Sequence, residues 1–322
     1  MNQKPEIVVI GAGIVDVLVS HVDARVFQTG STPAAGIAMQ TGGDALNEAV
    51  VLSKLGRTVG LVSRLGQDSA GGLVLQTCND KGVDSRWIAR DPDLDTGINV
   101  VLIAPDGERR FITNPEGSLR KITSEDVFAA VRHPDFAEAR VASFASIFVY
   151  PMLMPALEDI FAAIKAKGLI LCADMTRPKH GEKVEDIRKA LQYVDYIFPN
   201  YEEAAQVTGC TEPKDIASRF LDCGVKHVAI KLGKHGCLIR DAQTCKIVSA
   251  VPGIQAVDTT GAGDNFAAGF ISALCENMDF EFCARRANAT ASVCVQRIGA
   301  TSGTRDLREI MRRAVELTSM DL

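Results

Sequence analysis

The sequence predicts an α/β protein in which a parallel sheet is covered by helices and carries a small second sheet. Three observations lead to this prediction. Short β-branched runs alternate with longer amphipathic stretches, two segments break that alternation, and helical patterns accumulate toward the C-terminus. Strands that are apolar at nearly every position are typical of parallel sheets buried on both faces. The alternation therefore indicates βαβ units around a parallel sheet.

The elements follow one another along the chain. β-branched runs favour strands, whereas apolar residues at positions i, i+3, i+4 and i+7 favour helices. Strands are expected at residues 6–10, 58–63, 141–149, 168–173, 193–198 and 225–231. Helices are expected at residues 44–55, 69–81, 154–167, 202–208, 213–223, 262–276 and 280–297.

Two segments, 14–43 and 96–113, do not fit the βαβ alternation. The first has little helical signal. The second places Asp106-Gly107 between alternating apolar residues, which is a strong hairpin signal. We expect both segments to form a small sheet that projects as a lid over a site. Because the chain shows neither internal repeats nor a low-complexity linker, residues 1–322 are predicted to form a single domain with this lid.

Composition excludes several classes of protein. The 322 residues are 47% hydrophobic and 23% charged, as in globular proteins, and their net charge is 35 − 40 = −5. This acidity disfavours nucleic acid and anionic membranes as partners. Apolar stretches are broken well before 18 residues, and Glu6 interrupts the first one, so neither a membrane span nor a secretory signal is expected. Nine scattered Cys without a CxxC pair and five His without HExxH predict reduced thiols in a cytoplasmic protein without a His/Cys metal site.

The strongest motif is the run Gly261-Ala262-Gly263-Asp264. Apolar residues repeat with helical spacing from Phe266 onward, so the glycine-rich run lies at a helix N-terminus. Free N–H groups and the positive end of the helix dipole make such a terminus an anion site. Asp264 lies in the first turn and is a candidate general base toward an attacking hydroxyl. The alternative is a plain glycine turn in which Asp264 only favours the helix dipole.

A second motif joins Gly42-Gly43 to Asn47. Two glycines permit close approach of the backbone just before a helix that begins near Asp44. An amide one turn into that helix can both donate hydrogen bonds to vicinal hydroxyls and accept them. The alternative is an Asp44 N-cap with an exposed Asn47.

The third motif, Asn200-x-x-Glu203, follows the strand expected at 193–198. Ligands bind at the carboxyl ends of strands in open α/β sheets. Residues three apart share one face of a helix, and their oxygens could hold the waters of a Mg²⁺ ion. A capping pair formed by Asn200 and Glu203 explains the pattern equally well.

Two weaker motifs also follow predicted strands. The segment containing Lys231, Gly233 and Gly236 is either a β-hairpin or the rim of a nucleotide site. Residues 11–13 begin like a dinucleotide fingerprint, but Asp16 stands where its third glycine should be and no helix is expected there. Asp16 is better placed to bind a substrate hydroxyl, although a loop Asp without a role is the alternative.

Together these motifs resemble those of the ribokinase (PfkB) family of carbohydrate kinases. Gly42-Gly43 with Asn47, Asn200-x-x-Glu203 and the segment 258–264 occur in the family's order, and the resemblance covers essentially the whole chain. It implies a three-layer α/β/α ribokinase-like sandwich with a small β-sheet lid. It also implies phosphorylation of a sugar-like alcohol, with ATP, Mg²⁺ and, in potassium-activated members, K⁺.

The resemblance also assigns roles by position. Asp264 would be the base, and the amides of Gly261, Ala262 and Gly263 would hold the transferring phosphate. Substrate hydroxyls would be bound by Asp16, Gly42, Gly43 and Asn47. The nucleotide would lie near Asn200, Lys231, Gly233, Gly236 and Asn288, with Glu203 organising Mg²⁺ through water. A monovalent cation would lie against the backbone around Asp258, Thr260 and Gly299, where the chain resembles the cation loop of potassium-activated members.

One departure bears on the substrate. Asp44 stands where ribokinases proper have Lys, and the stretch from Asp174 to Pro178 is similar to that of 2-keto-3-deoxygluconate kinases and fructokinases. Arg177 could bind a substrate carboxylate bidentately or form a surface ion pair. A keto-sugar, a sugar acid and a nucleoside stay open as substrates.

Two rival functions stand beside the kinase. One is a sugar- or nucleotide-sensing protein that has lost its chemistry, against which the intact Gly261–Asp264 run argues. The other is a nicotinamide-dependent oxidoreductase, which Asp16 disfavours. The resemblance further implies that lid sheets pair, so a homodimer is an expectation.

Overall fold

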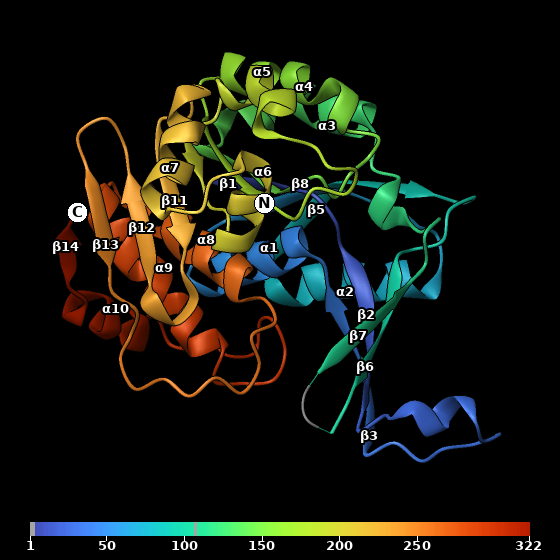
Figure 1. Cartoon of the computed structure of the whole chain (residues 1–322). Coiled ribbons are helices and arrows are strands. Elements are labelled where there is room, and N and C mark those ends of the chain that lie inside the picture. The colour runs from blue at the N-terminus through green and yellow to red at the C-terminus, as the bar shows by residue number, and fades with distance from the viewer. Residues whose placement is uncertain (1–3, 106–107) are drawn as a thin grey trace.

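The computed structural model describes residues 4–105 and 108–322, and it contains a central sheet of ten strands within those residues (Figure 1). In order across the sheet the strands are β14 (Ser319–Asp321), β13 (Cys245–Val248), β12 (Cys237–Arg240), β11 (His227–Lys231), β10 (Tyr196–Ile197), β9 (Ile170–Met175), β8 (Val141–Ile147), β1 (Ile7–Ile10), β4 (Val59–Gly66) and β5 (Val83–Asp91). Neighbouring strands from β5 to β11 are parallel, which confirms the predicted βαβ core. The pairs from β11 to β14 are antiparallel. The sequence offered a hairpin after β11 as one alternative, but it did not predict β13 and β14.

Helices cover both faces of this sheet, so the architecture is the expected three-layer sandwich. One face carries α1 (Asp44–Lys54), α2 (Ser69–Lys81), α8 (Ala262–Cys275), α9 (Phe280–Cys294) and α10 (Leu307–Glu316). The other carries α3 (Ser124–Arg132), α4 (Leu157–Ala166), α5 (Arg188–Leu191), α6 (Tyr201–Thr208) and α7 (Pro213–Asp222). Successive residues of a strand point to opposite faces. In β1, Val8 and Ile10 accordingly join one apolar core, whereas Ile7 and Val9 join the other.

The two segments that break the alternation form a second, four-stranded sheet, hereafter the lid sheet. Its order is β3 (Gly36–Gly42), β2 (Ile14–Ser20), β6 (Ile98–Ile103) and β7 (Arg109–Thr113). It projects away from the body in Figure 1. The antiparallel pairing of β6 with β7 confirms the predicted hairpin, whose Asp106-Gly107 turn lies outside the described residues. That this sheet moves as a lid stays a prediction.

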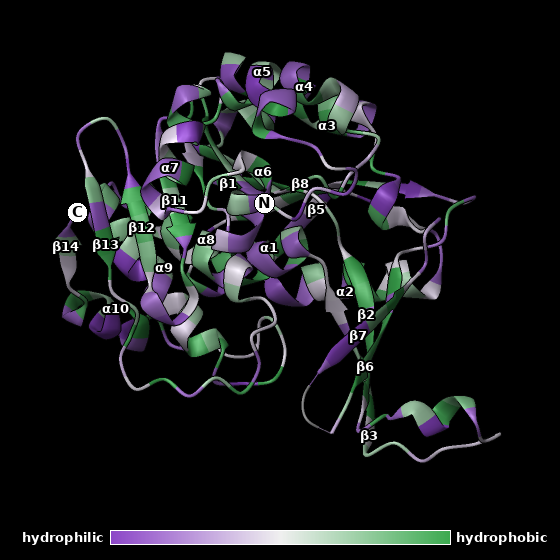
Figure 2. Ribbon diagram, in the orientation of Figure 1, coloured by the Kyte–Doolittle hydropathy of each residue, from purple (hydrophilic) through white to green (hydrophobic). Residues whose placement is uncertain are grey.

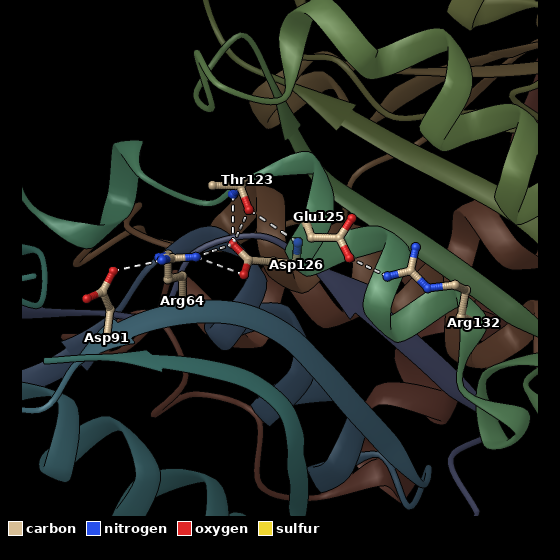
Figure 3. Close-up of polar contacts among 6 residues, drawn as sticks. All are labelled: Arg64, Asp91, Thr123, Glu125, Asp126 and Arg132. Carbon is tan, nitrogen blue, oxygen red and sulfur yellow. Dashed lines mark hydrogen bonds and ion pairs between the residues drawn. The ribbon is translucent and has the colours of Figure 1, made fainter.

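A polar cluster ties two elements that the sequence did not predict, β5 and α3, to β4. Arg64 of β4 bridges Asp91 of β5 at 2.7 Å and Asp126 of α3 at 2.9 Å (Figure 3). Asp126 also closes the capping box of α3 with Thr123. Because these partners lie 27 and 62 residues from Arg64 in the sequence, no local pattern predicts these contacts.

Other short elements escaped prediction for a related reason. Strands β12 and β13 have four residues each, too few to show a period. In Figure 2, β11 and β12 are largely apolar and the covering helices are mixed. The nine cysteines are unpaired and seven are buried, as expected for packed thiols. Within the described residues, no helix combines the length and the apolar character needed to cross a membrane.

Candidate active site

Asp264 and Asn47 meet at the point where α1 and α8 begin. Helix α8 starts after Gly261, whose φ of 74° places it in the left-handed region that favours glycine. Asp264 follows in the first turn, and its Oδ2 accepts a 2.8 Å hydrogen bond from Nδ2 of Asn47. Asn47 is only 6% exposed, so the alternative of an exposed amide after an N-cap is wrong. The two strongest motifs, 217 residues apart in sequence, therefore form one site.

The glycine pair lets the lid sheet approach this site closely. A Cβ at Gly42 would lie 2.2 Å from Oδ2 of Asp16 on the neighbouring strand β2. A Cβ at Gly43, with φ of 94°, would lie 2.5 Å from the carbonyl oxygen of Ala12. Asp16 also accepts a 3.0 Å hydrogen bond from Nδ2 of Asn99 in β6. Side chains at positions 42 and 43 would therefore clash with their neighbours. Their absence allows the Asp16 carboxylate to lie beside the start of α1.

Burial, together with nearby negative charge, raises the pKa of Asp264 well above its ordinary value. Although the side chain keeps some contact with solvent, enough protein surrounds its carboxyl to disfavour the charged form, and Asp44 adds like-charge repulsion. The hydrogen bond from Asn47 acts in the opposite direction. A carboxylate with a raised pKa is a stronger base, which suits proton abstraction from an alcohol.

Lys231 and Asp174 form an ion pair against the α8 terminus. Nζ of Lys231 lies 2.5 Å from Oδ2 of Asp174, and a Cβ at Gly263 would lie 3.2 Å from Nζ. Burial raises the pKa of Asp174 to about 7 despite its partner. The negative charges of Asp174 and Glu203 outweigh burial at Lys231 and raise its pKa, so the ammonium stays charged beside the glycine-rich turn. The sequence assigned Asp174 no role, although it directly follows the strand predicted at residues 168–173.

Glu48, next to Asn47, is a further buried acid that sequence reasoning missed. It is 1% exposed, and its Oε1 lacks a hydrogen-bond partner among the described residues. Burial, with some repulsion from Asp174 and Asp44, raises the pKa of Glu48 to about 8. Its signal in the sequence is weak, because a charged residue on an apolar helix face looks like an interruption of the pattern.

Asn200 and Glu203 form the capping pair that the sequence offered as an alternative. Oδ1 of Asn200 accepts from the backbone N–H of Glu203 at 2.9 Å, and Glu203 Oε2 accepts from the Asn200 N–H at 3.3 Å. Their role toward Mg²⁺ stays a prediction. Arg177 is exposed, and its positive charge reaches Glu203.

The segment after β11 is the hairpin that the sequence allowed. Gly233 begins a short 3₁₀ turn, and Gly236 packs so tightly that a Cβ would lie 2.0 Å from the carbonyl oxygen of Val248. Asn288 of α9 donates to the carbonyls of Val248 and Ser249 at 3.1 and 3.0 Å. These bonds hold the end of β13, against which Gly236 packs, on α9. Nucleotide contact by this region stays a prediction.

Asp258, Thr260 and Gly299 lie together, as the resemblance implied. Asp258 accepts from the backbone N–H of Thr260 at 2.9 Å and of Gly299 at 2.8 Å. Asn265, also missed at first, donates to the carbonyls of Gly261 and Ala300 at 2.8 and 2.7 Å. This side chain joins the α8 terminus to the loop that contains Gly299.

The glycine-rich stretch after β1 leads into strand β2 and no helix follows, so it is not a dinucleotide fingerprint. A family model for the pfkB family carbohydrate kinases matches residues 4–307. The chain belongs to this family. It is a kinase that transfers phosphate from ATP to a hydroxyl of a sugar or sugar-like molecule. The oxidoreductase alternative is excluded.

Relatives of this kinase come from more than one branch. It is 29% identical to a ribokinase of Arabidopsis thaliana, over 96% of this chain and 80% of that one. It is 24% identical to a 2-dehydro-3-deoxygluconokinase of Haemophilus influenzae, over 88% and 94%. A solved structure of Arabidopsis thaliana ribokinase with ribose and ATP superposes with a TM-score of 0.82 at 26% identity, covering 97% of this chain and 99% of that one. The predicted branch is therefore supported only loosely.

Proposed function

We propose that Asp264 is the general base of this kinase and that the first turn of α8 holds the phosphate in transfer. One observation carries the proposal. The Asp264 carboxylate, the Asn47 amide and the N–H groups of the glycine-rich turn converge where α1 and α8 begin. Of these N–H groups, that of Ala262 donates to the carbonyl of Thr259 at 3.2 Å and would have to exchange this bond for one to the phosphate. A substrate hydroxyl held by Asn47 would then lie within reach of both the base and the phosphate.

In the proposed reaction, Asp264 takes the proton from the attacking hydroxyl as its oxygen bonds to phosphorus. The N–H groups of Gly261, Ala262 and Gly263 and the Lys231 ammonium would stabilise charge on the phosphoryl oxygens. Asn47 would orient the substrate, and at the same time its bond to Asp264 fixes the carboxylate. Asp16, Gly42 and Gly43 would bind further hydroxyls from the lid side.

Carboxylates exceed cations around this site, so a triphosphate needs an added positive charge there. Glu203 lies close enough to Lys231 and Asp174 for mutual electrostatic effects. Mg²⁺ prefers oxygen ligands and keeps several waters, and Glu203 would hold it through water. When bound, Mg²⁺ supplies neutralisation of the phosphate charge. The nucleotide would extend along Asn200 toward Gly233, Gly236 and Asn288.

The substrate is proposed to be a keto-sugar or sugar acid. Asp44 stands at the start of α1 beside Asp264 and accepts a hydrogen bond from Ser146. Arg177 is exposed near Glu203, where its guanidinium is free to bind a substrate carboxylate bidentately. We further propose that the protein acts in the cytoplasm and pairs through its lid sheet, where Ile37 and Phe111 are 73% and 59% exposed.

A panel of sugars, sugar acids and nucleosides tested for ATP consumption would identify the acceptor. Each compound is tested with the wild type and with Asp264→Asn, so that contaminating ATPase activity is subtracted. The proposed class is supported if the wild type phosphorylates a sugar acid and Arg177→Ala does so with a raised KM. Phosphorylation of nucleosides alone would overturn it, and no phosphorylation of any acceptor would favour the sensing protein.

A further inference from the structure

One cationic side chain of the lid sheet, that of Arg109, contacts the loop that precedes α8. Arg109, the first residue of β7, places Nη2 2.8 Å from Oδ1 of Asp258, and its Nη1 donates to the hydroxyl of Thr260. The Asp258 side chain is 3% exposed and that of Arg109 is 22% exposed. This contact joins residues about 150 positions apart and ties the end of the lid hairpin to the body.

The Asp258 carboxylate holds together the loops that flank the anion-binding turn. Its Oδ1 accepts from the Thr260 N–H and from Arg109, and its Oδ2 accepts from the Gly299 N–H. Gly261, directly after Thr260, packs against Ala300 so closely that a Cβ would lie 2.5 Å from the Ala300 Cβ. A change at Asp258 would therefore move both loops that position the start of α8.

The residues of this loop do not fit a bound K⁺ ion. Both carboxylate oxygens of Asp258 already accept hydrogen bonds. The Thr260 hydroxyl oxygen accepts from Arg109, and the Thr260 carbonyl accepts from the Cys294 thiol at 3.4 Å. The carbonyl of Gly299 also accepts from the Ser302 hydroxyl at 3.2 Å. A guanidinium thus stands where the family resemblance suggested a monovalent cation.

We propose that Arg109 supplies the positive charge of this loop in place of a monovalent cation, and so acts as a positioning residue for the anion-binding turn. One charge replaces one charge at a nearly buried carboxylate, which forms no other ion pair among the described residues. Because Arg109 belongs to β7, the charge reaches Asp258 only while the lid sheet lies against the body. The phosphate site would then be fully ordered only while this end of the lid hairpin contacts the body. This inference rests on the proposed role of the α8 terminus.

The test compares potassium with tetramethylammonium chloride at equal ionic strength. Wild-type enzyme should melt and turn over equally in both salts. Arg109→Ala should lose about tenfold to a hundredfold in kcat in tetramethylammonium, with a smaller change in KM for the sugar. Potassium should restore much of that loss and should raise the melting temperature of Arg109→Ala by about 2–4 °C.

Two further variants serve as controls. Arg109→Lys keeps the charge and should stay insensitive to potassium. Arg110→Ala removes the neighbouring arginine of the same strand, which is 74% exposed and pairs with Glu108, and should behave as the wild type.

Potassium activation of the wild type would overturn the proposal, as would full activity of Arg109→Ala in tetramethylammonium. It would also be overturned if Arg109→Ala lost activity and potassium changed neither its rate nor its melting temperature. The melting comparison uses neither sugar nor ATP, so it remains informative even if Asp264 is not the base.

Discussion

The central sheet and the lid sheet are both rich in apolar residues, yet they bury them to different extents. Every residue of β8 is buried because helices cover both faces of the central sheet. In the lid-sheet strand β3, Ile37 and Met39 are 73% and 64% exposed. A sheet with one uncovered face cannot remove its apolar residues from water. The body therefore has the core that stabilises the fold, whereas the lid sheet has groups free to meet substrate or another surface.

The largest expected effect lies in the body, at Asp264. Asp264→Asn keeps the size of the side chain but removes the basic oxygen, so turnover should fall by roughly 10²–10⁴. Loss of a contact with the helix dipole alone would cost only about 0.3–1 kcal/mol of stability. Rate and melting temperature are measured on the same preparation. Asp279→Asn, at the N-cap of α9, is the matched control and should affect only stability. A near wild-type rate in Asp264→Asn would end the catalytic assignment.

Glu48 tests how far the body tolerates buried charge. Its pKa of about 8 in the folded protein lies above the ordinary 4.5, so the protonated carboxyl favours the fold below pH 4.5 and that stabilisation is lost as pH rises through 8. Glu48→Gln cannot ionise. It should therefore match the wild type in stability at pH 5 and exceed it at pH 8 by on the order of 2–4 kcal/mol.

Denaturant unfolding at the two pH values measures this difference. Glu125→Gln removes an exposed glutamate that pairs with Arg132 (Figure 3), and it should show no comparable dependence on pH. If Glu48→Gln were less stable than the wild type at pH 8, the ionised Glu48 carboxylate would stabilise the fold, and the prediction would be wrong.

Asn47 tests which face of the site belongs to the sugar. Asn47→Ala removes one or two hydrogen bonds and should weaken sugar binding by on the order of 1–3 kcal/mol, with ATP affinity nearly unchanged. Calorimetric titration of each ligand checks this, with the exposed Asn79→Ala as control. A fall in ATP affinity alone would show that the two halves of the site have been assigned in reverse.

The smallest expected effect on stability concerns the uncovered face of the lid sheet. Ile37→Glu should dissociate a dimer that pairs through this face, and it should leave the melting temperature of the body nearly unchanged because Ile37 packs in neither core. Val315→Glu introduces the same charge at a 65% exposed position of α10 and should not affect association. Sedimentation at several concentrations distinguishes them. An unchanged dimer in Ile37→Glu, or a monomeric wild type, would contradict pairing through this face.

Local patterns predicted most of the elements that are long enough to show a period, although the nine-residue elements β5 and α3 were missed. Helices α1, α2, α8 and α9 were predicted within a few residues of their bounds, because each repeats apolar residues over three turns or more. The lid hairpin was predicted from its turn residues, Asp106-Gly107. Strands β13 and β14 were missed, since short strands have no period and their position depends on the neighbours with which they pair.

The sequence by itself determined the α/β class, the second sheet and the motifs around Gly43, Asn200 and Asp264, because each depends on neighbours a few residues away. The sequence did not show that Asn200 and Glu203 form a capping box, because a capping box and a Mg²⁺ site would need the same two residues. Only the tertiary structure brought Asn47 onto Asp264, Lys231 onto Asp174 and Arg109 onto Asp258. Those pairs span 57 to 217 residues, and burial then set the charge of each group. Which side chains share a site, and in which protonation state, was decided by packing across the sheet and by no pattern along the chain.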